Sequence, residues 1–269
     1  MAQRSYGPGY QGGRQGRPAD TPGAGPGLAA RPDRVAVLRQ HIVRLADKAP
    51  GSQHLPEAEE QLELLSQALK RDLVAYEDQI LQITLECTWE LPHKLPYYAA
   101  LLGLLNVADY NFVQRAVEAV HAALQAGLAR GDPLTIRLGL RILATLAGTL
   151  VASPAGVLRL FQALVTDAVA ALDAAPAWQA RGDWYVYAVL GALPWGGKEL
   201  QRGAPAALAE LLDLAATYCQ HRDHLALPAL HAQHTLPDGT PAPDAPDYVE
   251  ALQAAVAALA QDATWTVKS

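Results

Sequence analysis

Five side chains that could bind a metal ion lie close together near the end of the sequence. They fall within 16 positions, as Cys219, His221, His224, His231 and His234. Thiolates and imidazoles are ligands that zinc prefers, and two H-x-x-H pairs could place imidazoles around one ion. Such pairs are common by chance, however, and structural zinc is typical of domains too small to be stable without it. We therefore predict ordinary histidines at a helix end and in a loop, and keep a zinc-dependent enzyme as an alternative.

No other pattern in the sequence supplies catalytic machinery. The G-x-S-x-G, H-E-x-x-H, Walker A and S-x-x-K patterns do not occur. GPGYQG at 7–12 matches G-x-G-x-x-G, but no strand precedes it and no helix follows it, so a phosphate cradle is not expected. QGGRQGR at 11–17 has a Gly/Arg character that can bind RNA weakly, although we favour a solvated tail. We predict no catalytic residue, no bound metal and no cofactor.

The segment RGDWYVYAVLGALPWGGKEL at 181–200 concentrates aromatic residues in a chain that has few of them. Asp183 is suited to cap the N-terminus of a helix that begins at Trp184. In that helix Trp184 and Tyr187 share a face at helical spacing, whereas Tyr185 lies on another face. We therefore expect Trp184 and Tyr187 to pack in the core. The candidate partner-binding residues are Tyr185, Trp195 and Lys198.

Helical periodicity continues from Arg34 to Asp262 and predicts the elements that position these side chains. The clearest helix follows Asp109, carries one apolar stripe, and is closed by Gly131. The expected helices are one from residue 34 and others at 57–70, 73–90, 96–106, 110–130, 134–150, 155–172, 184–193, 206–219 and 246–262. Short turns at GDP, SPAG and PWGG imply antiparallel neighbours. The predicted fold class is all-α, a HEAT-like antiparallel helical repeat, or α-solenoid.

Composition divides the chain into a tail and a folded domain. Residues 1–33 are rich in glycine and proline with few large aliphatics, and we predict a disordered tail there and a helical-repeat domain over 34–269. The segment 235–247 carries four prolines and is expected to be a surface loop. An apolar stretch between Arg141 and Arg159 is interrupted by proline and glycine, so we expect no membrane span. Two cysteines without a secretory signal favour a reducing compartment.

Charge is unevenly distributed, although the whole chain has a net charge of −6. Residues 1–44 hold seven arginines and two aspartates, a net charge of +5, which leaves −11 for the remainder. A folded part this acidic is poorly suited to binding a phosphate backbone by itself. Direct contact with nucleic acid is therefore expected from the tail or from a partner.

Two long segments carry a family resemblance. DWYVYAVLGALPWGGKEL at 183–200 and LPHKLPYYAALLGLLNVADYNF at 91–112 resemble the first helical domain of the large subunits of nuclear cap-binding complexes, and YVEALQAAVAALAQDATW at 248–265 lies where that family has a closing helix. The resemblance runs in order from about residue 35 and implies a HEAT-like repeat of the type found in the middle domain of initiation factor 4 gamma.

The resemblance also implies a role. Large subunits of this family are scaffolds rather than enzymes, and they hold a small RRM-bearing subunit that binds the RNA cap. The implied partners are that small subunit and factors for mRNA splicing, export and nonsense-mediated decay, with capped RNA contacted indirectly. The implied location is the nucleus, with shuttling to the cytoplasm.

This chain departs from the family pattern. A full-length large subunit resembles three such domains, the small subunit is bound mainly by the later ones, and the Lys/Arg-rich import signal often found near the N-terminus is here replaced by scattered arginines. A generic helical adaptor in translation or mRNA decay is the alternative function.

Overall fold

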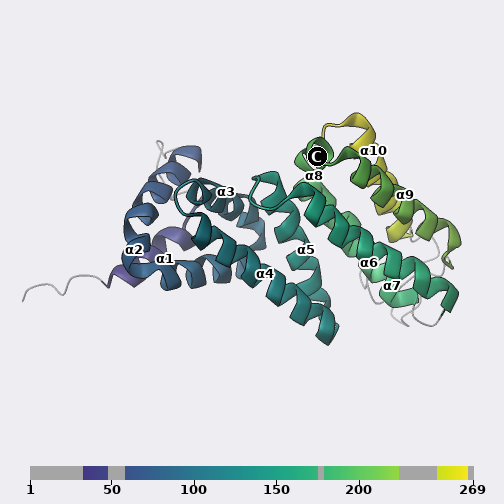
Figure 1. Cartoon of the computed structure of the whole chain (residues 1–269), viewed down its shortest axis with the longest axis horizontal. Helices are drawn as coiled ribbons and strands as arrows, with labels where there is room; N and C mark the ends of the chain where they lie inside the picture. Colours follow the sequence, from purple (N-terminus) through teal and green to yellow (C-terminus); the bar gives the residue numbers. More distant parts are fainter. Residues whose placement is uncertain (1–32, 48–57, 175–178, 224–246, 266–269) are drawn as a thin grey trace, which may run out of the picture. The chain divides into compact units, whose positions relative to one another are not determined.

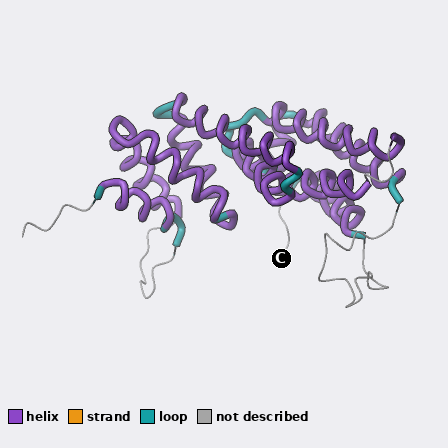
Figure 2. Tube along the Cα trace, turned by 90° about the horizontal axis from the view of Figure 1, so that it is seen from below, coloured by secondary structure: helices purple, strands orange, loops and turns teal. Residues whose placement is uncertain are grey.

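The described part of the chain is built from helices. The computed structural model describes residues 33–47, 58–174, 179–223 and 247–265, and no strand occurs within those ranges (Figure 2). The prediction of an all-α fold is therefore confirmed. The chain divides after Asp33 into two units, and every helix of the described ranges lies in the second unit, Arg34–Ser269.

Ten α-helices follow one another in the described ranges (Figure 1). They are α1 (Arg34–Val43), α2 (Ala58–Glu90), α3 (Leu95–Asn106), α4 (Tyr110–Arg130), α5 (Pro133–Gly148), α6 (Pro154–Ala174), α7 (Gln179–Ala192), α8 (Gly197–Gly203), α9 (Pro205–His221) and α10 (Tyr248–Asp262). Two short 3-10 helices, η1 (Pro92–Lys94) and η3 (Leu193–Trp195), precede α3 and α8.

Helices pack both with their neighbours in sequence and with helices farther along the chain. α1 packs against α2, α4 against α5, and α6 against α7. α7 also contacts α5 and α10, and α6 contacts α9, so α6, α7 and α9 run side by side (Figure 1). The helical repeat predicted from the sequence is therefore confirmed. Its interior is mostly leucine, valine and alanine, and the largest fully buried side chains include Tyr98, Phe112, Phe161 and Tyr218.

The helix boundaries around α4 and α5 agree with the sequence signals. The carboxylate of Asp109 accepts a hydrogen bond from the backbone N–H of Phe112 and caps α4. Gly131 ends α4 with a φ of 65°, a left-handed conformation that glycine adopts without steric cost. Asp132 then accepts hydrogen bonds from the backbone of Leu134 and Thr135 and caps α5. The GDP turn therefore closes one helix and starts the next.

The structure departs from the predicted helices at three places. The break expected at residues 71–72 is displaced to Tyr76, where φ is −134° and ψ is 27°, because nothing between 70 and 73 disfavours a helix. α8 was not predicted, since seven residues are too few to show a period. α7 begins at Gln179 rather than at Trp184, and Asp183 is therefore inside the helix instead of capping it.

One described helix is long and apolar enough, by length and composition alone, to cross a membrane. It is α6, over Pro154–Leu172, and 33% of that segment is buried within the domain. Core helices pass the same test, and α6 packs against α5, α7 and α9. A single helix of this kind is weak support for a membrane span.

Several sequence predictions lie outside the described residues. They are the predicted disorder of the tail over 1–32, the two glycine-rich motifs within it, and the loop predicted at 235–247 except for Asp247.

Candidate partner-binding surface

Asp183 anchors α7 to the rest of the domain through a buried arginine. Arg222, which follows α9, donates from Nε to Asp183 Oδ1 at 2.6 Å and from a terminal nitrogen to Oδ2 at 3.1 Å. The two side chains are 1% and 0% exposed. Tyr218 Oη also donates to Asp183 Oδ1, at 2.8 Å. The carboxylate is therefore used in an ion pair between α7 and the end of α9, and the predicted role as an N-cap is wrong.

Arg222 also binds the first residue of the α10 segment. It forms an ion pair with Asp247, whose carboxylate caps α10 by accepting from the backbone N–H groups of Val249 and Glu250. Burial opposes the charge of Arg222, but the hydrogen bonds with Asp183 and Asp247 raise its pKa. Burial likewise opposes ionisation of Asp247, and hydrogen bonding to Arg222 lowers the pKa of Asp247. One guanidinium thus joins α7, α9 and α10.

The PWGG turn fixes Trp195 against α5 by close backbone contact. A Cβ atom on Gly196 would lie 2.0 Å from the carbonyl oxygen of Ala144, and one on Gly197 would lie 2.0 Å from the ring of Trp265. Only glycine fits at either position without moving backbone or an indole ring. Trp265 is itself held by a hydrogen bond from Nε1 to Gln201, at 2.6 Å. Sequence reasoning identified the turn but not the close approach that requires it.

A row of arginines and aromatic rings follows the boundary between α5 and α7. We call it the arginine–aromatic seam and define it as Arg137, Arg141, Trp184, Tyr187 and Trp195. Cζ of Arg137 lies 5.9 Å from the centroid of Tyr187, and Cζ of Arg141 lies 5.4 Å from that of Trp195. The rings of Trp184 and Tyr187 are 5.6 Å apart and tilted by 35°. All five side chains are half-buried.

The seam contains polar groups without partners. Nε of Arg141 and Nε1 of Trp184 are both buried and have no hydrogen-bond partner. Burial, and then the charge of neighbouring Arg137, lower the pKa of Arg141. Within the described ranges no carboxylate forms an ion pair with either arginine. The seam is therefore a site of uncompensated positive charge.

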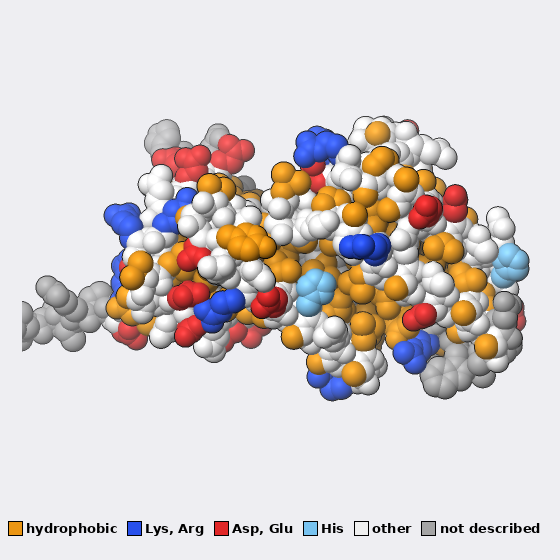
Figure 3. Space-filling view, viewed as in Figure 1, with side chains coloured by type: hydrophobic (Ala, Val, Ile, Leu, Met, Phe, Trp, Pro, Cys, Tyr) orange, Lys and Arg blue, Asp and Glu red, His pale blue; other side chains and the backbone are white. Residues whose placement is uncertain are grey.

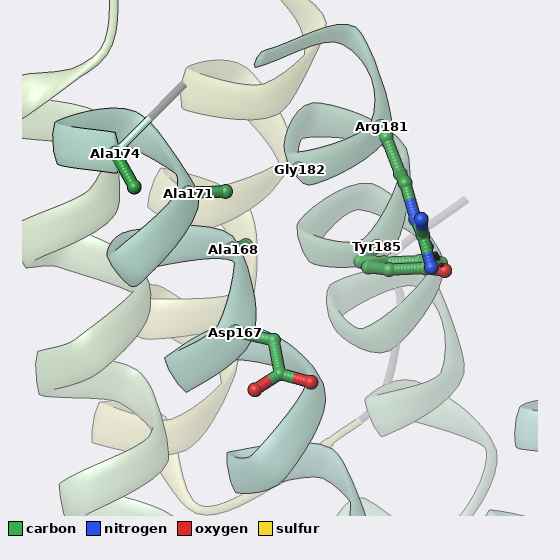
Figure 4. A pocket seen from close by; sticks show the side chains of 7 residues that line it. All are labelled: Asp167, Ala168, Ala171, Ala174, Arg181, Gly182 and Tyr185. Carbon is green, nitrogen blue, oxygen red and sulfur yellow. Dashed lines mark hydrogen bonds between the residues drawn. The ribbon is translucent and has the colours of Figure 1, made fainter. Parts of the chain in front are cut away.

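Two hollows lie on either side of Arg181 and Tyr185, and one of them is lined by Trp184 of the seam. Arg181 lies along the ring of Tyr185 and donates from Nε to its hydroxyl at 2.8 Å (Figure 4). One hollow, of about 380 Å³, has alanine side chains of α6 and Asp167 on its opposite wall (Figure 4). The other, of about 520 Å³, is formed by the α4–α5 turn and α7 and includes Trp184 in its lining. Hydrophobic side chains gather over the region between the ends of α4 and α6 (Figure 3).

The structure places the three candidate partner-binding residues in different environments. Trp184 and Tyr187 share a face, as predicted, but both are only half-buried, whereas Tyr185 is 7% exposed and belongs to the core. The prediction that Trp184 and Tyr187, rather than Tyr185, fill the core is therefore wrong. The reason is that α7 packs against α6 as well as against α5 and α10, so it buries residues on more than one face. Trp195 is half-buried in the seam, and Lys198 is exposed on α8.

The described residues do not supply the set of metal ligands that the sequence suggested. Cys219 is buried on α9, where burial raises the pKa of its thiol to about 11. His221 is exposed and its Nδ1 lies 2.8 Å from the carbonyl oxygen of Thr217. His224, His231 and His234 lie outside the described residues. Among the residues that are described, no group of three histidine, cysteine, aspartate or glutamate side chains could hold a metal ion.

Sequence reasoning missed the two arginines of the seam as functional candidates. Arg137 and Arg141 are four residues apart and therefore lie on one face of α5, a signal that the sequence already contains. What it did not reveal is that this face lies beside α7, where aromatic rings meet the guanidinium groups.

Comparison with known proteins gives a consistent family. Residues 57–243 match the family described as MIF4G domain. The chain is also similar to proteins named nuclear cap-binding protein subunit 1: it is 33% identical over 72% of its length to that of Arabidopsis thaliana, 32% identical over 86% to that of Oryza sativa subsp. japonica, and 34% identical over 86% to that of Anopheles gambiae. It covers 23%, 27% and 27% of those relatives, or about a quarter of their length.

Proposed function

Because the chain belongs to the MIF4G domain family, we propose that it acts as a scaffold of a nuclear cap-binding complex and supports binding of capped RNA by a small RRM-bearing subunit. The observation that carries this proposal is the similarity, over 86% of the chain, to proteins named nuclear cap-binding protein subunit 1. We infer a nuclear location, with shuttling to the cytoplasm, on the same basis.

The physical properties of the helical domain support a scaffold rather than an enzyme or a direct RNA reader. Residues 45–269 carry a net charge of −11, which repels a long phosphate chain. On α7, Asp183 is occupied by its ion pair with Arg222, and one face of Tyr187 is covered by Arg137. The proposed partners are therefore proteins: the small subunit, and factors of mRNA splicing, export and nonsense-mediated decay.

Retention on an immobilised cap analogue tests the proposal. The full chain is applied with the small subunit, with the small subunit replaced by buffer, and with free cap analogue as competitor. We expect retention only when the small subunit is present and only without competitor. If the chain is not retained under any of these conditions, the proposal that it belongs to a cap-binding complex is contradicted.

A generic adaptor in translation or mRNA decay is the second candidate. The observation in its favour is that residues 57–243 match the family described as MIF4G domain. Association with the small subunit on the cap resin excludes the adaptor as the sole role, whereas association with translation or decay factors without that subunit supports it.

A further inference from the structure

The arginine–aromatic seam differs from the other half-buried and buried cation sites of the domain. Lys94 and Arg222 each have an acidic partner within salt-bridge distance. Arg137 and Arg141 instead lie beside each other, and the described ranges offer neither of them an ion-pair partner. Two like charges held together and partly withdrawn from water are unfavourable unless an anion joins them. The seam thus has the charge pattern of a site that binds carboxylates or phosphates.

The hollow next to the seam favours a peptide over a nucleic acid. Trp184 lines the hollow of about 520 Å³ and also contacts Tyr187, so hollow and seam are continuous. The other lining side chains include Leu128, Pro133 and Ile136, which suit an aliphatic or aromatic side chain. A peptide can supply both an apolar side chain and carboxylates in one short stretch.

The aromatic rings of the seam are poorly placed to bind bases. A guanidinium group lies over Tyr187 and another over Trp195, so one face of each ring is occupied by this chain's own side chains. Single-stranded nucleic acids bind mainly by stacking bases on open aromatic faces within a positive groove. The acidic remainder of the domain would also repel a phosphate chain longer than the seam.

We propose that the arginine–aromatic seam binds a short acidic segment of a partner protein, with carboxylates on Arg137 and Arg141 and one apolar side chain in the hollow beside Trp184. Guanidinium groups bind carboxylates through paired hydrogen bonds, and stacking on Tyr187 and Trp195 orients them in advance. The interaction requires neither a cap nor a small subunit, so it is independent of the proposed function.

Fluorescence anisotropy on the full chain tests the proposal. The probe is a labelled peptide in which a Leu–Phe pair is flanked on both sides by glutamates, and the matched control peptide carries glutamine in place of every glutamate. We expect the glutamate peptide to bind at least about tenfold more tightly, a difference of about 1.4 kcal/mol or more. Its affinity should fall as salt is raised.

Three variants locate the binding site. The double variant Arg137→Gln/Arg141→Gln should lose about tenfold or more in affinity for the glutamate peptide. Arg159→Gln removes an exposed arginine of α6 that lines neither the seam nor the hollow, and should leave the affinity unchanged. Ala129→Trp adds a large side chain at an exposed position of the hollow, keeps both arginines, and should weaken binding without touching the charges.

Several results with the peptides and variants would each overturn the proposal. They are no binding of the glutamate peptide, equal binding of the glutamine peptide, an equal loss in Arg159→Gln and the double variant, and no effect of Ala129→Trp. Oligouridylate is titrated in parallel. If it binds more tightly than the glutamate peptide and loses affinity in the double variant, the seam is an RNA-binding surface instead.

Discussion

Two arginine sites beside the segment of α7 and η3 are in opposite situations. In the first, Arg222 is 1% exposed and contacts Asp183, Asp247 and, at 3.7 Å, Glu250. In the second, Arg141 stacks on Trp195 beside a second arginine, and the described chain offers it no acidic partner. Arg222 is fully paired within the domain and stabilises the fold. Arg141 keeps charge and hydrogen-bonding capacity that another molecule could use.

The difference has an energetic meaning. A buried ion pair contributes little compared with well-packed apolar residues, but removing one partner strands the other charge in the interior. A half-buried arginine stacked on a ring gains about 0.5–2 kcal/mol from the ring, which offsets its partial loss of hydration. Variants at Arg222 should therefore damage the domain, whereas variants at Arg141 should leave it folded.

The largest expected effect is that of Arg222→Met. It leaves the fully buried carboxylate of Asp183 without its cation, and we expect a loss of about 3–5 kcal/mol in the free energy of unfolding. Arg141→Met is the matched control, with an expected change within about 1 kcal/mol. Urea unfolding followed by circular dichroism measures both. Similar shifts of the two urea unfolding midpoints would contradict the distinction between Arg222, which is paired with carboxylates, and Arg141, which is not paired with one in the described part of the chain.

The next effect compares neighbours on α7. Tyr185 is 7% exposed, so Tyr185→Ala should cost about 3 kcal/mol, as other buried aromatic truncations do. Trp184 is half-buried at the hollow, and Trp184→Ala should cost about 1–2 kcal/mol because it removes less buried area. The order is the reverse of the one that sequence periodicity predicts. A larger loss for Trp184→Ala in the same unfolding experiment would restore the sequence-based assignment of faces.

Sequence reasoning succeeded where the signals are local. α4 was predicted with its ends because Asp109, an apolar stripe and Gly131 all lie within one continuous segment. The start of α7 was not predicted correctly, because Asp183 is buried in an ion pair with Arg222, which is 39 positions away in the sequence. An aspartate before an aromatic run has the same local signature whether it caps a helix or forms a buried ion pair.

The candidate site shows the same limit. The spacing of Arg137 and Arg141 can be read from the sequence, and so can the rings of 184–195. Their meeting depends on how α5 packs against α7 and on the close approach of Gly196 to Ala144, which holds the turn after α7 against α5. Neither the periodicity nor any motif of the two segments, taken separately, predicts that they are in contact.

A smaller effect concerns acid. Because hydrogen bonding to Arg222 outweighs burial, the folded pKa of Asp247 lies below its ordinary value. The stability that it contributes is therefore present above the unfolded-state pKa of about 3.9 and is lost as the pH falls through the lower folded pKa. Asp247→Asn keeps a good N-cap for α10 but removes this dependence.

Urea midpoints between neutral pH and about pH 3 measure the acid effect. We expect Asp247→Asn to be less stable than the unmodified chain at neutral pH and to approach it in acid. The double variant Arg137→Gln/Arg141→Gln should instead run parallel to the unmodified chain, since the seam contains no carboxylate. If the urea midpoint of the double variant instead approached that of the unmodified chain in acid, a carboxylate would have to pair with the seam in the free protein.

The smallest expected effect is a null one: the chain alone should bind capped RNA no more tightly than uncapped RNA. Cap recognition requires two aromatic planes around a positively charged base, with carboxylates at its edge. The seam has the opposite charge pattern, because arginines already cover Tyr187 and Trp195 and would repel a cationic base.

Fluorescence titration with matched capped and uncapped oligonucleotides measures the ratio of the two affinities. Any residual binding should come from the arginines of the tail and disappear when residues 1–30 are deleted. A clear preference for the cap, surviving that deletion, would show that this chain binds the cap itself and that the arginine–aromatic seam is not reserved for a protein partner.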